Sequence, residues 1–172
     1  MNKTMALAFS TLLAVPLTAV AAGPVEGDKS FTIAGSGSND KDFDNGAYGV
    51  TAEVGYFLTD AWQAGLRQSV NGFAGDEAKN SWNGATRGFI EYNFLDGKYR
   101  PYLGANLGGI YGENVSNTGT AGLEAGLKLY VLEKTYINFG VEYAFLFNDT
   151  DDFQNKSNNG IYLYNIGVGF NW

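Results

Sequence analysis

The closing segment of the chain, GIYLYNIGVGFNW (160–172), alternates between two kinds of side chain. Large apolar and aromatic residues occupy the even positions from Tyr162 to Trp172, whereas small or polar residues prevail at the odd positions from Asn165 to Asn171. Successive side chains of a β-strand point to opposite faces, so the segment predicts a strand with one oily face and one small, polar face. The fold depends on which face meets the surrounding solvent.

The beginning of the chain has the pattern of a secretory signal peptide. A lysine precedes an apolar run (5–20), and the small-x-small motif AVA (19–21) is typical of a cleavage site. A membrane-spanning helix is the alternative, but the run falls short of the roughly 20 residues that a bilayer requires and contains Pro16. We therefore predict a cleaved signal peptide over 1–22 and a single mature domain over 23–172.

The composition excludes several classes of function. The chain has no cysteine, so an exported domain would have no disulfide to stabilise it. It also has no histidine, the most frequent general base and metal ligand near neutral pH. Its formal charge is −7 and it contains no basic tract, which argues against a nucleic-acid partner. We expect no enzymatic activity, no cofactor and no metal site.

Period-2 alternation recurs along the mature chain, and no stretch carries a sustained helical stripe. The alternation predicts strands at 29–37, 47–58, 61–70, 81–94, 100–111, 120–131, 136–147 and 160–172. Short turns and long polar connections alternate between these segments, which is typical of an up-and-down meander. Such a meander can close on itself and leave no edge strand. The sequence therefore predicts an all-β, eight-stranded antiparallel barrel.

The size of this barrel decides which face is outside. An eight-stranded barrel has an interior that side chains just fill, so the oily faces would overfill it and leave an exterior poor in charge. A secreted barrel that binds an apolar ligand is therefore the less favoured alternative. With lipid outside, small and charged residues line the lumen and the strands have membrane-spanning length. Two aromatic girdles then mark the interfaces: Tyr56, Trp62, Tyr92, Phe94 and Trp172 near the short turns, and Tyr48, Trp82, Tyr111, Phe145 and Tyr162 near the long connections.

The chain resembles the small eight-stranded outer-membrane barrels of Gram-negative bacteria, such as the OmpA barrel domain and OmpX-like proteins. The resemblance rests on the signal peptide, on the alternating turns and loops, and on the closing YLYNIGVGFNW (162–172). It implies a monomer in the bacterial outer membrane, exported through the periplasm. The implied partners are outer-membrane lipids, lipopolysaccharide, periplasmic chaperones and the barrel assembly machinery. The closing segment resembles the aromatic signal that this machinery recognises, which would be carried by Tyr164, Ile166, Val168, Phe170 and Trp172.

The inward-facing positions carry charged residues, which we predict to form an ion-pair network in the lumen: Glu53, Arg67, Arg87, Glu91, Glu124, Lys128 and Glu142. Counting from the short turns places Glu53 nearly opposite Arg67, with Arg87 within reach, and places Glu124 nearly opposite Glu142. Two adjacent carboxylates require a cation between them, or one of them keeps its proton. Buried charges must be paired, and pairing across strands also fixes the register of the barrel.

Three functions of this network stay open at the level of sequence. The leading one is a satisfied plug in a non-enzymatic, envelope-structural protein that displays its loops outside. The second is a narrow channel for small solutes or ions, gated by exchange of salt-bridge partners. The third is a Glu124/Glu142 acid–base pair of a hydrolase, but no nucleophile is visible beside it. Outer-membrane lipid hydrolases of this architecture resemble one another in using a catalytic histidine, and this chain has no histidine.

The long connections are acidic, and we expect them to form a solvated rim that divalent ions bridge to lipopolysaccharide phosphates. They lack the spaced ligands and the glycine of an EF-hand loop. The acidic residues are Asp40, Asp42, Asp44, Asp76, Glu77, Asp149, Asp151 and Asp152.

Overall fold

The structure, a computed structural model, describes residues 23–40, 46–74, 82–112, 118–147 and 160–172. The predicted signal peptide and, apart from Asp40, the acidic residues of the long connections lie outside these ranges. Within them, no helix has the length and hydropathy needed to cross a membrane.

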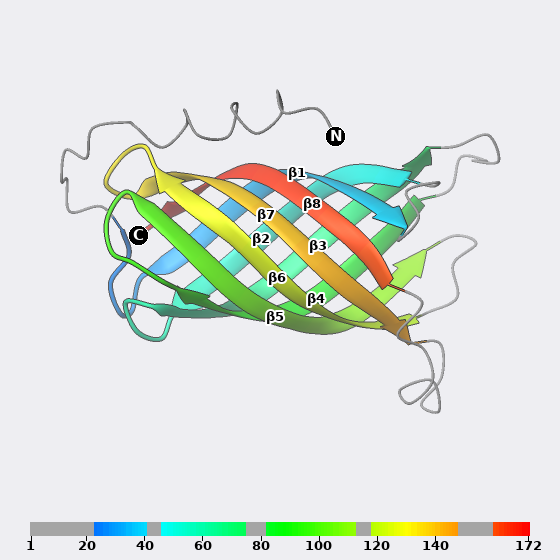
Figure 1. Cartoon of the computed structure of the whole chain (residues 1–172), viewed down its shortest axis with the longest axis horizontal. Helices are drawn as coiled ribbons and strands as arrows, with labels where there is room; N and C mark the ends of the chain where they lie inside the picture. The colour runs from blue at the N-terminus through cyan, green and yellow to red at the C-terminus, as the bar shows by residue number, and fades with distance from the viewer. Residues whose placement is uncertain (1–22, 41–45, 75–81, 113–117, 148–159) are drawn as a thin grey trace, which may run out of the picture.

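The described residues form one closed barrel of antiparallel strands (Figure 1). Every strand pairs with its neighbours in sequence, and the first strand also pairs with the last. The strands are β1 (Lys29–Asp40), β2 (Gly46–Phe57), β3 (Trp62–Ala74), β4 (Trp82–Asn93), β5 (Tyr99–Gly112), β6 (Thr118–Tyr130), β7 (Thr135–Phe147) and β8 (Gly160–Asn171). The predicted all-β, eight-stranded antiparallel barrel is confirmed.

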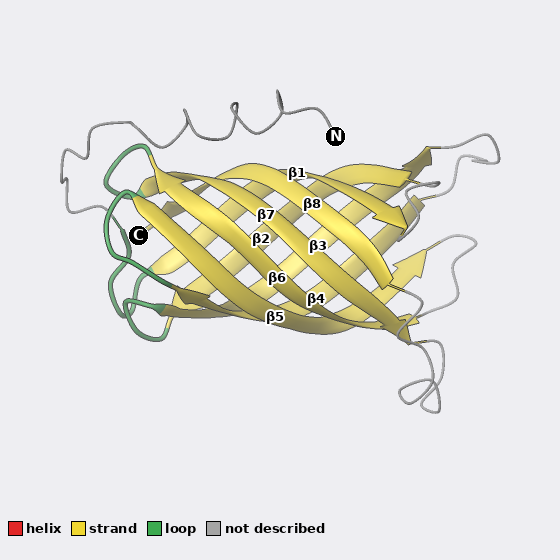
Figure 2. Cartoon of the chain, viewed as in Figure 1, coloured by secondary structure: helices red, strands yellow, loops and turns green. Residues whose placement is uncertain are grey.

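The two ends of the barrel differ in their connections. Turns at 58–61, 94–98 and 131–134 join strands at one end, where the chain also enters β1 and leaves β8 (Figure 2). Toward the other end some strands are longer than their alternation predicts, and β1, for example, continues to Asp40. The side chains there are small or polar, but the backbone is still paired on both sides, to β2 and to β8. Backbone pairing therefore extends the strand beyond the point where side-chain alternation stops.

The oily faces of the strands point outward. Ile166 of β8 is 57% exposed and Leu107 of β5 is 67% exposed, whereas Arg67 of β3 is 3% exposed and Glu91 of β4 is 2% exposed. Large apolar side chains therefore cover the outside while charged side chains fill the bore, the reverse of a soluble protein. The predicted inversion is confirmed, and the alternative of an apolar bore is wrong.

The outward aromatic residues contact one another at both ends of the barrel. Near the short turns, the ring of Tyr92 lies 5.0 Å from the rings of Trp62 and of Phe94, both edge to face. Toward the other end, the ring of Tyr143 lies 5.0 Å from that of Tyr162. Edge-to-face pairs of this kind stabilise the wall beyond the burial of their area.

Candidate functional site

The strand register places like charges side by side on two walls of the lumen. Arg67 of β3 is directly opposite Arg87 of β4, and Glu124 of β6 is directly opposite Glu142 of β7. Like charges in such positions destabilise a strand pair. The two walls neutralise each other across the bore, because Nη1 of Arg67 lies 2.6 Å from Oε2 of Glu124 and Nη1 of Arg87 lies 2.7 Å from Oε2 of Glu142. Only the closed barrel supplies these contacts.

Arg67 is the centre of this network. Its Nε donates to Glu53 on the neighbouring strand, to which the register pairs it. Its terminal nitrogens also lie 3.4 Å from Glu142 and 3.7 Å from Glu91, so one guanidinium contacts carboxylates from four strands. These several ion pairs offset the free-energy cost of removing the guanidinium from water.

The partners of Arg87 differ from those that sequence counting indicates. Counting placed Arg87 within reach of Glu53, whereas the side chain crosses the bore to Glu142 and lies 3.4 Å from the hydroxyl of Ser69. Neighbouring positions on the wall are read from sequence, but the width of the closed bore decides which side chains meet across it.

Lys128 forms a second layer nearer the short turns. Its Nζ lies 2.5 Å from Oε2 of Glu91 and 2.6 Å from Oε1 of Gln63. Aromatic rings surround the same ammonium with centroids 4.9–5.9 Å away, those of Phe57, Tyr102 and Tyr136. A cation held between carboxylate and ring faces is stabilised by both. All seven charged residues expected in the lumen therefore lie in two contiguous layers of its interior.

Sequence reasoning missed Arg100 and the aromatic side chains of the interior. Arg100 is 2% exposed and donates to the backbone carbonyls of Asp60 and Pro24. Its even-numbered position on the same strand as Tyr102 was the available signal, because it assigns the side chain to the inner face. The buried inward aromatic residues are Phe57, Phe89, Tyr102, Tyr130 and Tyr136.

Small residues on the inner face leave room for these large side chains. A Cβ at Gly122 would lie 2.4 Å from Oε1 of Glu142. A Cβ at Gly126 would lie 2.3 Å from the backbone carbonyl oxygen of Phe139 and 2.4 Å from Cζ of Tyr102. These distances are too short for real atoms, so the glycines and the side chains that cross the bore fit only in combination.

We expect Gly126→Ala to lower the free energy of unfolding by about 1–3 kcal/mol, because overpacking displaces the Tyr102 ring and the layer around Lys128. Urea titration of the refolded barrel in detergent measures the change. The matched control is Gly88→Ala on the outer face of β4, where the nearest atoms to the new Cβ are 3.9 Å away. Equal effects of the two substitutions would contradict the tight inner packing.

Several buried polar side-chain atoms inside the barrel have no hydrogen-bond partner among the described residues. They are Nε of Arg87, Oε1 of Glu124, both amide atoms of Asn106 and Oγ1 of Thr120. The four residues lie on the adjacent strands β4, β5 and β6. Unsatisfied buried groups are costly, and ordered water is their usual partner in proteins.

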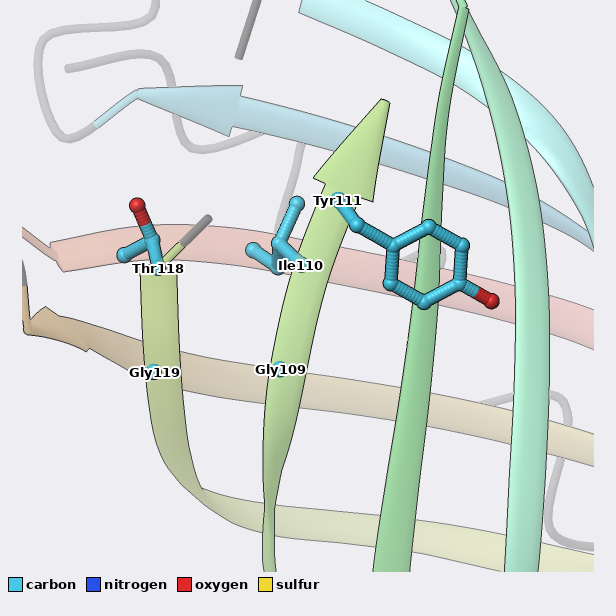
Figure 3. Close-up of a pocket in the computed structure, with 5 residues that line it drawn as sticks. All are labelled: Gly109, Ile110, Tyr111, Thr118 and Gly119. Atoms are coloured by element: carbon cyan, nitrogen blue, oxygen red, sulfur yellow. The ribbon is translucent and has the colours of Figure 1, made fainter. Parts of the chain in front are cut away.

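Gln68, Thr86 and Tyr111 form a polar cluster on the outer face. Nε2 of Gln68 lies 2.8 Å from the Tyr111 hydroxyl, and Oγ1 of Thr86 donates to Oε1 of Gln68 at 2.6 Å. Figure 3 shows Tyr111 extending sideways from β5, and its ring covers Gly84 of β4. The three side chains satisfy one another, so the cluster is compatible with an apolar surround.

Beside this tyrosine lies a surface depression of about 360 Å³ between β5 and β6 (Figure 3). Gly109 and Gly119 face each other there in the strand register and bring no side chains to the wall. The depression lies at the end of β5 and the start of β6, apart from the ion pairs of the lumen.

The paired carboxylates of the interior are the groups to consider for metal binding within the described ranges. No group of three or more histidine, cysteine, aspartate or glutamate side chains there is placed to hold a metal ion. Glu124 and Glu142 are both buried and both engaged by arginine.

No protein-family model and no curated protein sequence matches the chain. Among solved structures, it is similar to Neisserial surface protein A, with a TM-score of 0.63 and 12% identity over 83% of this chain and 95% of that one. It is also similar to the N-terminal β-barrel domain of Pseudomonas aeruginosa OprF, with a TM-score of 0.57 and 23% identity over 86% of this chain and all of that one (100%).

The outer-membrane enzyme PagL is a third similar structure, with a TM-score of 0.56 and 13% identity over 81% of this chain and 98% of that one. One architecture thus supports different activities, and likeness at these identities establishes the fold alone. The chain therefore shares its fold with small eight-stranded outer-membrane β-barrels, the group that its sequence resembles.

Proposed function

We propose that this chain is a non-enzymatic, integral outer-membrane protein of a Gram-negative bacterium, whose filled barrel serves envelope structure and displays its long connections outside. The observation that carries the proposal is the central layer of ion pairs. Arg67 and Arg87 extend from one wall to Glu124 and Glu142 on the other. A hydrated ion could pass only if these buried contacts broke, and breaking them leaves uncompensated charge.

The outer surface supports a membrane location. Exposed aliphatic side chains cover the middle of the strands and aromatic side chains gather at their ends, as lipid and its two interfaces require. Similarity in fold to outer-membrane barrels supports the same location. We propose that outer-membrane lipids and lipopolysaccharide surround the barrel and that it is a monomer.

The final strand supports recognition by the barrel assembly machinery, with periplasmic chaperones as carriers. Its outward side chains form an unbroken apolar row that is accessible before the strand is surrounded by lipid. The row comprises Tyr164, Ile166, Val168, Phe170 and Trp172, which are 37%, 57%, 52%, 46% and 52% exposed.

The non-enzymatic part of the proposal is supported by chemistry rather than by fold. The chain has no histidine and no cysteine, and the paired carboxylates Glu124 and Glu142 are bound by arginine. The hydrolase interpretation would require one of them to reach a substrate and a nucleophile to lie beside it.

We expect the protein to be in the outer-membrane fraction, to shift on a gel between unheated and boiled samples, and to give no steady openings in a planar bilayer. The gel shift establishes that the reconstituted barrel is folded. An absence of channel openings then supports a closed lumen and does not merely reflect unfolded protein. Leu132→Ala serves as a surface control, because its 68% exposed side chain lies in a turn outside the bore.

A narrow channel is the second candidate function, and the unpaired buried atoms favour it. Arg87, Asn106, Thr120 and Glu124 offer polar groups on adjacent strands that a file of water would satisfy. Steady openings whose size changes in Glu91→Ala or Lys128→Ala would establish the channel and overturn the plug.

A further inference from the structure

The segment before β1 crosses the mouth of the barrel at the short-turn end (Figure 1). Its backbone is hydrogen-bonded to the ends of several strands. The backbone nitrogen of Gly23 donates to the carbonyl of Glu133 in the turn between β6 and β7 at 3.1 Å, and the amide of Gly27 donates to the carbonyl of Phe57 at the end of β2 at 2.9 Å. Residues 23–28 thus connect opposite parts of the rim, and we call them the strap.

The strap has a defined shape because of a turn at its second half. The amide of Asp28 donates to the carbonyl of Val25 at 3.0 Å, and Gly27 has a φ of 89°. This combination is typical of a type II turn, whose third position favours glycine. A β-branched residue at position 27 would therefore disfavour the conformation in which the strap lies across the mouth.

Arg100 holds the strap from inside the barrel. Its Nη1 lies 3.5 Å from the carbonyl oxygen of Pro24, and its Nη2 donates to the carbonyl of Asp60 in the turn between β2 and β3. The guanidinium also lies where a side chain at Gly23 would be, 2.5 Å from an ideal Cβ. A buried arginine bound to carbonyls of two segments ties them together and closes the space between them.

An aromatic layer lies between the strap and the ion pairs. The rings of Tyr130 and Tyr136 have centroids 5.2 Å apart. Their hydroxyls are hydrogen-bonded at 2.8 Å, that of Tyr136 to Thr32 and that of Tyr130 to the side-chain amide of Asn171. With these contacts the short-turn end is closed by packed rings as well as by the strap.

We propose that the strap is a seal that closes the short-turn mouth of the bore to water and small solutes. The seal goes beyond the proposed function, because it is a second barrier independent of the ion pairs. It closes this mouth with backbone hydrogen bonds and with the buried side chain of Arg100.

Single cysteines in this cysteine-free chain report access to the bore at each end. Ser30→Cys lies directly after the strap at a position that is 2% exposed. Ser36→Cys lies farther along the same strand at a half-buried inner position. Each is combined with Gly27→Val or Arg100→Met to release the strap, and with Val25→Ala as the control, since Val25 is 57% exposed. The rate of modification by a charged, membrane-impermeant thiol reagent is measured in the folded protein.

If the strap is a seal, Gly27→Val and Arg100→Met should each raise the modification rate of Ser30→Cys by about tenfold or more. The rate of Ser36→Cys should rise by less than about twofold, because only the strap end opens. Val25→Ala should leave both rates unchanged. An unchanged rate at Ser30→Cys in the two variants would overturn the seal, and so would an equal rise at both reporters. The heated-gel shift selects folded protein, and Arg100→Met keeps the test valid if Gly27→Val does not fold.

Failure of the seal is distinguishable from failure of the plug. Steady openings of the unmodified protein would count against the plug, whereas only the two labelling rates count for or against the seal.

Discussion

Replacing Arg67 with leucine is expected to lower the free energy of unfolding by about 3–5 kcal/mol or to prevent folding, the cost of leaving buried charge without its partner. The reason is the position of Arg67 at the centre of the lumen, where it contacts Glu53, Glu91, Glu124 and Glu142. Without it, Glu124 loses the one ion pair that it makes among the described residues and remains directly opposite Glu142.

Urea unfolding of the refolded barrel in lipid vesicles measures this loss. The informative comparison is Arg67→Leu combined with Glu53→Gln and Glu124→Gln, which removes the charges together with their partner. The combined variant should recover at least half of the lost stability, because removing both sides of a buried pair costs less than removing one. A loss below about 1 kcal/mol for Arg67→Leu alone would mean that water already solvates the central layer.

Ile166→Arg is expected to cost about 2–4 kcal/mol in a bilayer, the penalty for a charge on the lipid face near the midplane. Ile166 is 57% exposed in the middle of β8. In a water-soluble protein, a substitution at so exposed a site changes stability by about 0.5 kcal/mol or less. The size of the effect therefore reports which solvent covers the outer face.

The control for Ile166→Arg is Leu132→Arg in the turn between β6 and β7. Leu132 is 68% exposed, so the two positions have similar accessibility but different predicted surroundings. Equilibrium unfolding in vesicles should show a large effect at Ile166 and almost none at Leu132. If both substitutions were neutral, water would cover the middle of the barrel and the membrane location would be wrong.

The alternation of the sequence was sufficient to predict the strands and their faces. It assigned Ile166 and Leu107 to the outside and Glu91 and Arg67 to the inside, and the structure confirms these faces. Period-2 alternation is a local property of the chain, and a one-residue error in it would have reversed every side chain.

The contents of the lumen were less predictable. Counting from the short turns gave the neighbours Glu53 with Arg67 and Glu124 with Glu142, which the register reproduces. Counting did not give the strap or the hydrogen-bond partners of Arg100, because these partners are backbone carbonyls of distant segments. Such contacts leave no pattern in side-chain chemistry.

The sequence by itself determined a barrel of alternating strands with an oily exterior and a charged interior, because strand periodicity and residue chemistry are local. Only the tertiary structure decided that the arginine wall of β3 and β4 meets the glutamate wall of β6 and β7. On each wall the neighbouring charges repel, and closure of the barrel sets the distance across the bore at which they become attractive.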